Sequence, residues 1–141
     1  MLMKKRIAVV GGGLIGLATA YKLLLKYPDV QLDLFEKEAH PGKHQSGRNS
    51  GVLHCGLYYQ PGSLKAKLAV EGIREMTAFC REHEITHEIC GKVVLAANEQ
   101  QNQTLRELAK RGEANGLQGL QFLSKSELRH REPMVQATEA L

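Results

Sequence analysis

The chain has 141 residues, a hydrophobic content of 43%, a charged content of 24% and a formal net charge of +4. These values are typical of an ordinary globular domain and exclude a disordered chain. An aromatic content of 5% without tryptophan offers no stacking surface for single-stranded nucleic acid, so we do not expect nucleic-acid binding.

The first half of the chain begins with a βαβ pattern. A β-branched strand is expected at residues 5–10, an apolar helix at 14–26 and a second strand at 31–36. The helix carries a broad apolar stripe, which is typical of a helix that covers a sheet. The fold class predicted from this start is α/β.

A glycine motif lies at the turn between the first strand and the helix. Gly11, Gly13 and Gly16 form G-x-G-x-x-G. The first glycine permits a tight turn, the second lets the backbone approach a pyrophosphate, and the third lets the helix pack closely. The helix N-terminus then presents N–H groups to the phosphates. Glu36, twenty residues after Gly16, stands where an acid accepts from a ribose hydroxyl, so the pattern predicts dinucleotide binding.

The N-terminus also imitates a secretory signal. Lys4–Arg6 precede an apolar run that extends from Ile7 to Ala20. Three consecutive glycines weaken an apolar helix, and cleavage after Ala20 would remove the phosphate-binding turn. We therefore expect this segment to be part of the folded domain and not a secretory signal. It is also too short and too glycine-rich to span a bilayer. Three cysteines without a C-x-x-C motif favour reduced thiols, and we expect a cytoplasmic location.

A polar, basic loop follows at residues 37–51 and is too rich in Gly, Ser and His to be an amphipathic crossover helix. Within it, Ser46–Gly51 combine hydroxyl, amide, guanidinium and bare backbone groups. This composition suits an arm that folds over a diphosphate and the ribityl end of a flavin. It therefore favours FAD over NAD, whose domains more usually continue into a third strand. A solvated surface loop is the alternative.

The second half of the chain alternates helices with short strands. A partly extended segment is expected at 52–59, followed by a helix that is capped by Ser63 and reaches about Glu82. A strand is expected at 91–97, followed by a polar helix that is capped by Asn98 and stopped by Gly116. The last expected elements are a strand at 121–123 and a helix that opens with the Ser124–Glu127 capping box and stops before Pro133. No closing strand is expected between Val135 and Leu141.

Two regions follow from this order. Residues 1–62 are expected to form an FAD-binding βαβ unit with a flavin-contacting loop, and residues 63–141 a helix and the beginning of a substrate-binding region. A doubly wound sheet needs further parallel strands to bury both faces of the first two. We therefore expect the N-terminal part of a Rossmann-like (GR2-type) FAD-binding domain, as the opening part of a longer protein.

His83–His87 matches the H-E-x-x-H zinc-protease pattern. That chemistry requires both histidines on one helical face. The preceding helix is expected to end near residues 82–84, and residues 85–89 to lead as extended chain into the next strand. Residues four apart in a strand lie about 13 Å from each other, which is too far for two ligands of one zinc ion. We expect no metal site.

Several strings resemble a known family. Residues 9–21, together with Leu34–Lys37, resemble the start of the D-amino-acid-oxidase-like FAD-dependent oxidoreductases. His44–Lys67 is similar to the L-2-hydroxyglutarate oxidase/dehydrogenase family, as are Cys90–Lys92 and Arg131–Pro133, so the resemblance covers essentially the whole chain. It implies FAD-dependent oxidation of L-2-hydroxyglutarate, or a related 2-hydroxy acid, to the 2-oxo acid. Quinone or oxygen would accept the electrons, and the full-length enzyme could associate peripherally with a membrane.

Members of that family run to several hundred residues, so a non-catalytic fragment is one alternative to an active enzyme. An NAD(P)-binding module is a second alternative.

Oxidation of a 2-hydroxy acid on a flavin needs a base for the hydroxyl proton and cations for the carboxylates. His54 is the candidate base, because histidine exchanges protons near neutral pH. The alternative is a structural histidine beneath the ring. Arg48 could pair with a phosphate or a carboxylate, or could be an exposed loop residue. The residues expected to contact FAD are Gly11, Gly13, Gly16, Glu36, Lys37, Ser46, Arg48, Asn49, Ser50, Gly51 and Val52.

Overall fold

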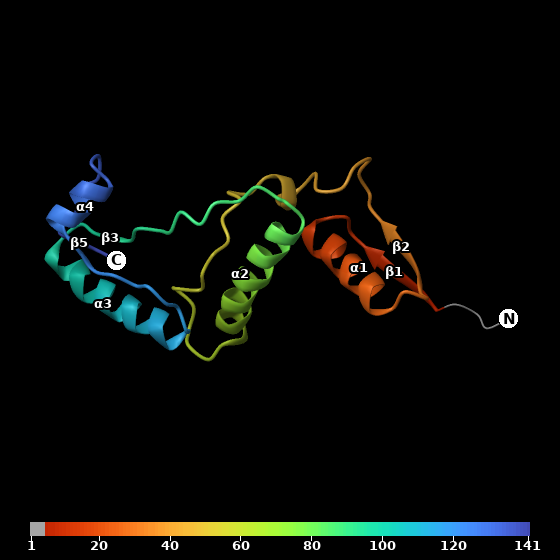
Figure 1. Ribbon diagram of the computed structural model, residues 1–141, viewed down its shortest axis with the longest axis horizontal. Helices are drawn as coiled ribbons and strands as arrows, with labels where there is room; N and C mark the ends of the chain where they lie inside the picture. Colours follow the sequence, from red (N-terminus) through yellow and green to blue (C-terminus); the bar gives the residue numbers. More distant parts are fainter. Residues whose placement is uncertain (1–4) are drawn as a thin grey trace. The chain divides into compact units, whose positions relative to one another are not determined.

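The computed structural model describes residues 5–141 (Figure 1). Residues 1–4, which include Lys4 of the basic N-terminal run, lie outside the described part. The chain forms two compact units that divide between Val52 and Leu53. The functional boundary expected after Gly62 stays a prediction.

The first unit is a βαβ unit made of β1 (Arg6–Val10), α1 (Leu14–Lys26) and β2 (Gln31–Phe35). β1 and β2 pair in parallel, with Arg6 opposite Gln31 and Val10 opposite Phe35. α1 packs against both strands (Figure 1). The three predicted elements are confirmed to within one residue at each end. A parallel pair joined by a helix is the arrangement that a glycine-rich turn requires.

Many apolar side chains of the first unit are exposed. Val10, at the end of β1, is 86% exposed, and Ile15, in the first turn of α1, is 80% exposed. Ala20 on α1 is the buried apolar residue of this unit within the described part of the chain.

A short 3₁₀ helix, η1 (Gln45–Gly47), interrupts the polar loop that follows β2.

The second unit contains three helices and three short strands, which alternate along the chain. Its elements are α2 (Leu64–Glu82), β3 (Leu95–Ala96), α3 (Glu99–Ala114), β4 (Leu123–Ser124), α4 (Lys125–Arg131) and β5 (Glu139–Ala140). The helix caps follow the sequence: Ser63 Oγ accepts from the Ala66 amide, and Asn98 Oδ1 accepts from the Gln101 amide. Ser124 and Glu127 form the predicted capping box.

The prediction that no strand closes the chain is wrong. β5 is the central strand of a three-stranded antiparallel sheet with the order β3-β5-β4. Leu141 extends the pairing, because its amide donates to the Val94 carbonyl at 2.9 Å and its carbonyl accepts from the Val94 amide at 2.8 Å. A two-residue strand has too few positions to show an alternating pattern, so β5 cannot be recognised from sequence periodicity.

The strand expected at 91–97 is shorter in the structure, and two other segments expected to be extended form no strand. The strand expected at 91–97 is reduced to Leu95–Ala96, which pairs with the equally short β5. Residues 52–59 form no strand and end in a turn at 56–59. Residues 85–94 are likewise outside strands, so the extended lead-in expected at 85–89 is not a strand either.

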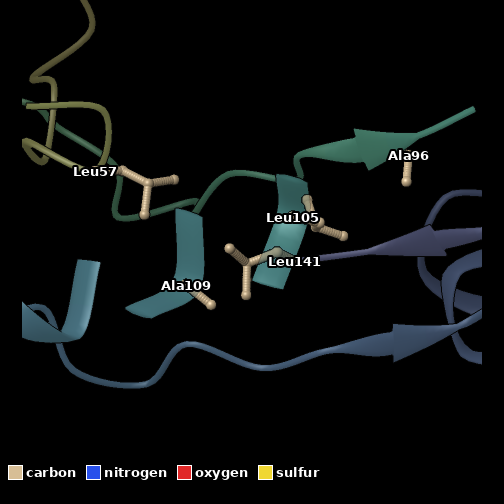
Figure 2. Close-up of a cluster of buried hydrophobic side chains, with 5 residues drawn as sticks. All are labelled: Leu57, Ala96, Leu105, Ala109 and Leu141. Carbon is tan, nitrogen blue, oxygen red and sulfur yellow. The ribbon is translucent and has the colours of Figure 1, made fainter. Parts of the chain in front are cut away.

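The core of the second unit lies where α3 meets the short sheet and the 56–59 turn. Figure 2 shows the buried side chains of this cluster: Leu57, Ala96, Leu105, Ala109 and Leu141. A second cluster beneath α4 contains Leu123, Leu128 and Ala140. Across residues 5–141, none of the helices is both long and apolar enough to cross a membrane.

Candidate functional site

The glycine-rich turn connects the C-terminal end of β1 to α1 and is hydrogen-bonded to the C-terminal end of β2. Gly11 has a φ of +106°, which side-chain-bearing residues rarely adopt, and its amide donates to the Phe35 carbonyl at 2.7 Å. An added Cβ at Gly16 would collide with the carbonyl oxygen of Gly11. Both glycines are therefore needed for α1 to start directly against the turn, as the motif predicts.

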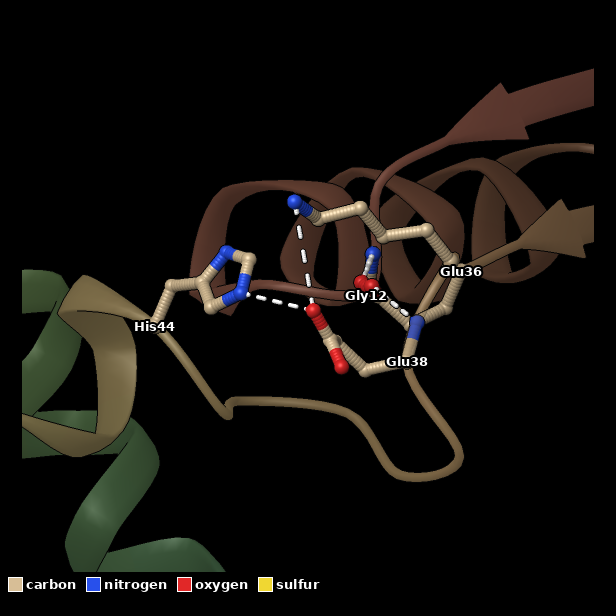
Figure 3. A network of polar contacts seen from close by, with 5 residues as sticks. Gly12, Glu36, Glu38 and His44 are labelled. Atoms are coloured by element: carbon tan, nitrogen blue, oxygen red, sulfur yellow. Dashed lines mark hydrogen bonds and ion pairs between the residues drawn. The ribbon is translucent and has the colours of Figure 1, made fainter.

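The Glu36 carboxylate closes the other side of this turn (Figure 3). Its Oε2 accepts from the Gly12 amide at 2.6 Å, and its Oε1 accepts from the Glu38 amide at 3.0 Å. The Glu38 amide, followed by the Gly12 amide, lowers the pKa of Glu36. The group is therefore ionised at neutral pH, and each oxygen keeps a lone pair for a further donor such as a ribose hydroxyl.

A second layer of contacts holds the loop after β2 against the turn. The Gly42 amide donates to the Gly12 carbonyl at 3.0 Å. Glu38 Oε1 lies 2.9 Å from His44 Nε2 and 3.9 Å from Lys37 Nζ (Figure 3). Sequence reasoning missed these roles of Gly12, Gly42, Glu38 and His44. The Pro41-Gly42 pair marks a turn, but nothing local indicates the partner that this turn contacts.

The predicted second arm reaches the glycine-rich turn through Ser46. The Ser46 Oγ accepts from the Leu14 amide at 2.8 Å. An added Cβ at Gly13 would lie 3.1 Å from this oxygen, so the missing side chain makes room for the contact. The first turn of α1 carries no acidic residue, which leaves the positive end of the helix available to an anion.

These groups surround a pocket of about 330 Å³ at the carboxyl ends of β1 and β2. Its lining residues are Val10, Gly11, Gly13, Phe35, Glu36, Lys37, Glu38, Gly42, Lys43, His44 and Ser46. The carboxyl edge of a parallel sheet is where open α/β folds bind ligands. A glycine cradle, a helix N-terminus and an ionised carboxylate fit the pyrophosphate and ribose of a dinucleotide.

The rest of the predicted arm does not line this pocket. Asn49 is engaged locally, because its Nδ2 donates to the carbonyls of Gln45 and Ser46 and its Oδ1 accepts from the Gly51 amide. Asn49 therefore shapes the arm around η1. The structure exposes Arg48, Ser50, Gly51 and Val52.

His54 is exposed and belongs to the second unit, as the second residue after the division. In the H-E-x-x-H string, α2 ends at Glu82, and His87 Nδ1 lies 2.9 Å from the carbonyl oxygen of Ile85. The two histidines are thus not on one helix. Residues 5–141 bring together no cluster of three or more His, Cys, Asp or Glu side chains able to hold a metal ion.

Comparisons with known proteins agree with this geometry. The sequence profile of the family described as "FAD dependent oxidoreductase" (DAO) matches residues 6–141. The chain is 45% identical over 139 residues to an L-2-hydroxyglutarate dehydrogenase of Indibacter alkaliphilus, covering 99% of this chain and 35% of the relative. It is 43% identical to a mitochondrial L-2-hydroxyglutarate dehydrogenase of Nematostella vectensis, covering 96% of this chain and 30% of the relative.

A solved structure is also similar. It is a dithionite-reduced L-α-glycerophosphate oxidase from Mycoplasma pneumoniae with FAD bound. The TM-score is 0.81 at 30% sequence identity, and the match covers 99% of this chain and 37% of the oxidase. The chain thus spans about a third of the length of each of these proteins.

Proposed function

Because the chain belongs to the FAD dependent oxidoreductase family, we propose that it supplies the FAD-binding part of an enzyme that oxidises L-2-hydroxyglutarate or a related 2-hydroxy acid. The observation that carries this proposal is the Glu36 carboxylate, which accepts from the Gly12 amide at 2.6 Å beside the glycine cradle. The relatives named L-2-hydroxyglutarate dehydrogenases support the substrate class.

The predicted residues fall into three groups in the proposed FAD site. Gly11, Gly13 and Gly16 keep the turn and α1 close, so that the helix N-terminus faces the pyrophosphate. Glu36 accepts from the ribose, and Lys37 and Ser46 stand at the same pocket. We assign Arg48, Asn49, Ser50, Gly51 and Val52 to the arm that contacts the flavin side of the cofactor.

Oxidation of a 2-hydroxy acid removes two electrons with a hydride from C2 and one proton from the hydroxyl. Bound FAD supplies the acceptor for the hydride. His54 takes the hydroxyl proton, and Arg48 pairs with an anionic group through its planar guanidinium. A quinone or oxygen is the proposed final electron acceptor, and the substrate is a small molecule.

The proposal extends to the location of the enzyme and to its contact with a membrane. Reduced thiols favour the cytoplasm, although relatives from Nematostella vectensis and Dictyostelium discoideum are named mitochondrial. A quinone acceptor would bring the enzyme to a membrane surface, so we propose peripheral association. If FAD-loaded protein does not sediment with lipid vesicles, peripheral membrane association is contradicted.

The first test is flavin retention. The purified chain is incubated with FAD, desalted and examined by visible absorbance, alongside Gly13→Val and Gly72→Val. Gly13→Val places a side chain against Ser46 and the phosphate path, whereas an added Cβ at Gly72 on α2 meets nothing within 4 Å. We expect flavin to stay with the wild type and Gly72→Val and to be lost from Gly13→Val. Equal retention by both variants would contradict the site.

The second test separates an enzyme from a non-catalytic fragment and from an NAD(P)-binding module. FAD-loaded protein is mixed anaerobically with L-2-hydroxyglutarate, and the D-enantiomer serves as the control. Bleaching of the flavin by the L-enantiomer alone supports the substrate class. A flavin that stays oxidised with both enantiomers supports the non-catalytic alternative, and binding of NAD(P) in place of FAD supports the third.

A further inference from the structure

A turn in the second unit follows directly after His54 and Cys55. Its four residues are Gly56–Tyr59, and the Tyr59 amide donates to the Gly56 carbonyl at 3.1 Å. Gly56 has a φ of +85°, so the backbone conformation is one that a residue with a side chain would adopt only under strain. Gly56 and Leu57 are buried, whereas Tyr58 is exposed.

One side of this turn packs on α3. Leu57 is 4% exposed and belongs to the core cluster with Leu105 and Ala109 (Figure 2). An added Cβ at Gly112 would lie only 2.7 Å from Leu57 Cδ1. The glycine on α3 therefore gives Leu57 the space in which it is buried.

The end of α3 also binds the backbone of the turn. The Asn115 Nδ2 donates to the Gly56 carbonyl at 3.0 Å and to the Tyr59 carbonyl at 2.9 Å. Arg111 donates from a guanidinium nitrogen to the Tyr58 carbonyl at 3.3 Å. Asn115 thus bridges the first and last residues of a turn that lies more than fifty residues earlier in the chain.

The orientation of the Asn115 amide follows from its partners. Both are carbonyl oxygens, so only the NH₂ group can face them. Its Oδ1 is buried and accepts no hydrogen bond from the described residues. Burial of an unsatisfied acceptor is unfavourable, so the amide is held there for its two donated bonds rather than for general packing.

The other side of the turn faces α2. An added Cβ at Gly56 would lie 3.2 Å from the Ala69 Cβ and 3.6 Å from the Ala66 carbonyl oxygen. The turn is therefore held between two helices of the same unit. Its position is fixed by α2 through close packing and by α3 through hydrogen bonds.

We propose that Asn115 is a positioning residue that fixes the Gly56–Tyr59 turn and, through it, the segment that carries His54. The proposal rests on the proposed function only for the catalytic role of His54. Loss of the two Asn115 bonds frees the carbonyls of Gly56 and Tyr59 and lets the preceding residues move, while α3 itself keeps its core contacts.

The test compares two asparagine-to-alanine variants, one within α3 and one at its C-terminal cap. Asn115→Ala removes the bonds to the turn. Asn102→Ala is the matched control, because Asn102 Oδ1 accepts from Thr138 Oγ1 at 2.9 Å near the sheet and does not contact the turn. Hydrogen exchange is followed by mass spectrometry in peptides that cover 53–60 and 99–114, and the ring signals of His54 are followed by NMR.

We expect Asn115→Ala to speed exchange in 53–60 by about ten-fold, the effect of losing hydrogen bonds of ordinary strength, and to shift the His54 signals. Exchange in 99–114 should stay within two-fold of the wild type, roughly the scatter of such measurements. Asn102→Ala should leave both 53–60 and His54 unchanged. Should Asn115→Ala fail to fold, Arg111→Met, which removes only the bond to Tyr58, should speed exchange in 53–60 by a smaller factor.

Unchanged exchange in 53–60, an equal increase over α3, or unshifted His54 signals would overturn the proposal. A merely structural asparagine would change protection across the whole unit and would leave no specific mark on His54. None of these measurements depends on FAD. A chain that binds no flavin would therefore contradict the proposed function without affecting this test.

Discussion

Ser46 and Leu14 are 32 residues apart in the sequence, and the Ser46 hydroxyl oxygen accepts a hydrogen bond of 2.8 Å from the Leu14 amide. Leu14 begins α1, so the bond satisfies one of the N–H groups that a helix leaves without an intrahelical partner. It also ties the loop after β2 to the glycine-rich turn. The Ser46 hydroxyl oxygen thus accepts from an amide at the N-terminus of α1, the kind of donor from which a phosphate oxygen also accepts.

Replacement of Ser46 by alanine should therefore destabilise the FAD-free protein. We expect Ser46→Ala to lower the free energy of unfolding by about 1 kcal/mol, because the Leu14 amide loses its acceptor. Urea denaturation followed by circular dichroism measures the change. Ser50→Ala, at an exposed position of the same arm, should change the midpoint little. Equal effects of the two variants would refute the role given to the Ser46–Leu14 bond.

Gly16→Ala tests the close approach of α1 to the turn. The added Cβ collides with the Gly11 carbonyl, which is backbone and cannot rotate away, so the helix must shift. Overpacking of this kind costs about 1–3 kcal/mol, and FAD retention should fall as well. In Gly72→Ala on α2 the Cβ meets nothing within 4 Å, and helix propensity should stabilise the protein by up to about 1 kcal/mol. Thermal denaturation of the two variants should therefore shift in opposite directions.

Glu36→Gln tests the charge of the carboxylate through pH. The amides of Glu38 and Gly12 lower the pKa of Glu36 in the folded chain, so the ionised group stabilises the fold above its unfolded pKa. That contribution is lost as the pH falls through the folded value. The urea midpoint of the wild type should thus exceed that of Glu36→Gln at neutral pH, and the gap should close in acid. Glu71→Gln, at an exposed position on α2, is the control, and a gap independent of pH would contradict the assignment.

Leu57→Ala tests the seat of the 56–59 turn on α3. Leu57 is 4% exposed, so truncation leaves a cavity against Leu105 and Ala109 and should cost about 2–5 kcal/mol. Leu64, at the start of α2, is 70% exposed, and Leu64→Ala should cost much less. Chemical denaturation monitored at the helix signal measures both. A small loss for Leu57→Ala would show that this core does not hold the turn.

Local signals predicted the elements well. α1 matches the prediction at both ends, because the glycines before it and Pro28 after it leave little choice of boundary. The Asn98 cap of α3 and the capping box at Ser124 involve residues three apart, so spacing alone reveals them. β5 escaped prediction because its pairing with β3 and with β4 covers only two residues each, too few for an alternating pattern to show in the sequence.

In the candidate site too, the local features could be predicted from the sequence and the contacts between distant residues could not. The roles of Gly11, Gly16 and Glu36 follow from motif spacing, and the structure brings Gly11 and Glu36 to one pocket. The bonds from the Gly42 amide to Gly12 and from the Leu14 amide to Ser46 join residues about thirty positions apart. Composition predicted a ligand-contacting loop, but it could not predict which atoms of the loop meet the glycine-rich turn, because these contacts depend on how the loop folds back.

The exposure of Val10 and Ile15 has a practical consequence for anyone handling this chain. Burying one such side chain fully contributes about 1.5–3 kcal/mol, and Leu14, Leu25 and Phe35 of the same unit are exposed as well, so association of these surfaces is favourable. The chain should brighten hydrophobic dyes such as ANS and should form larger species in light scattering as its concentration rises. Dilute samples and mild detergent are therefore the conditions in which the proposed flavin binding is best tested.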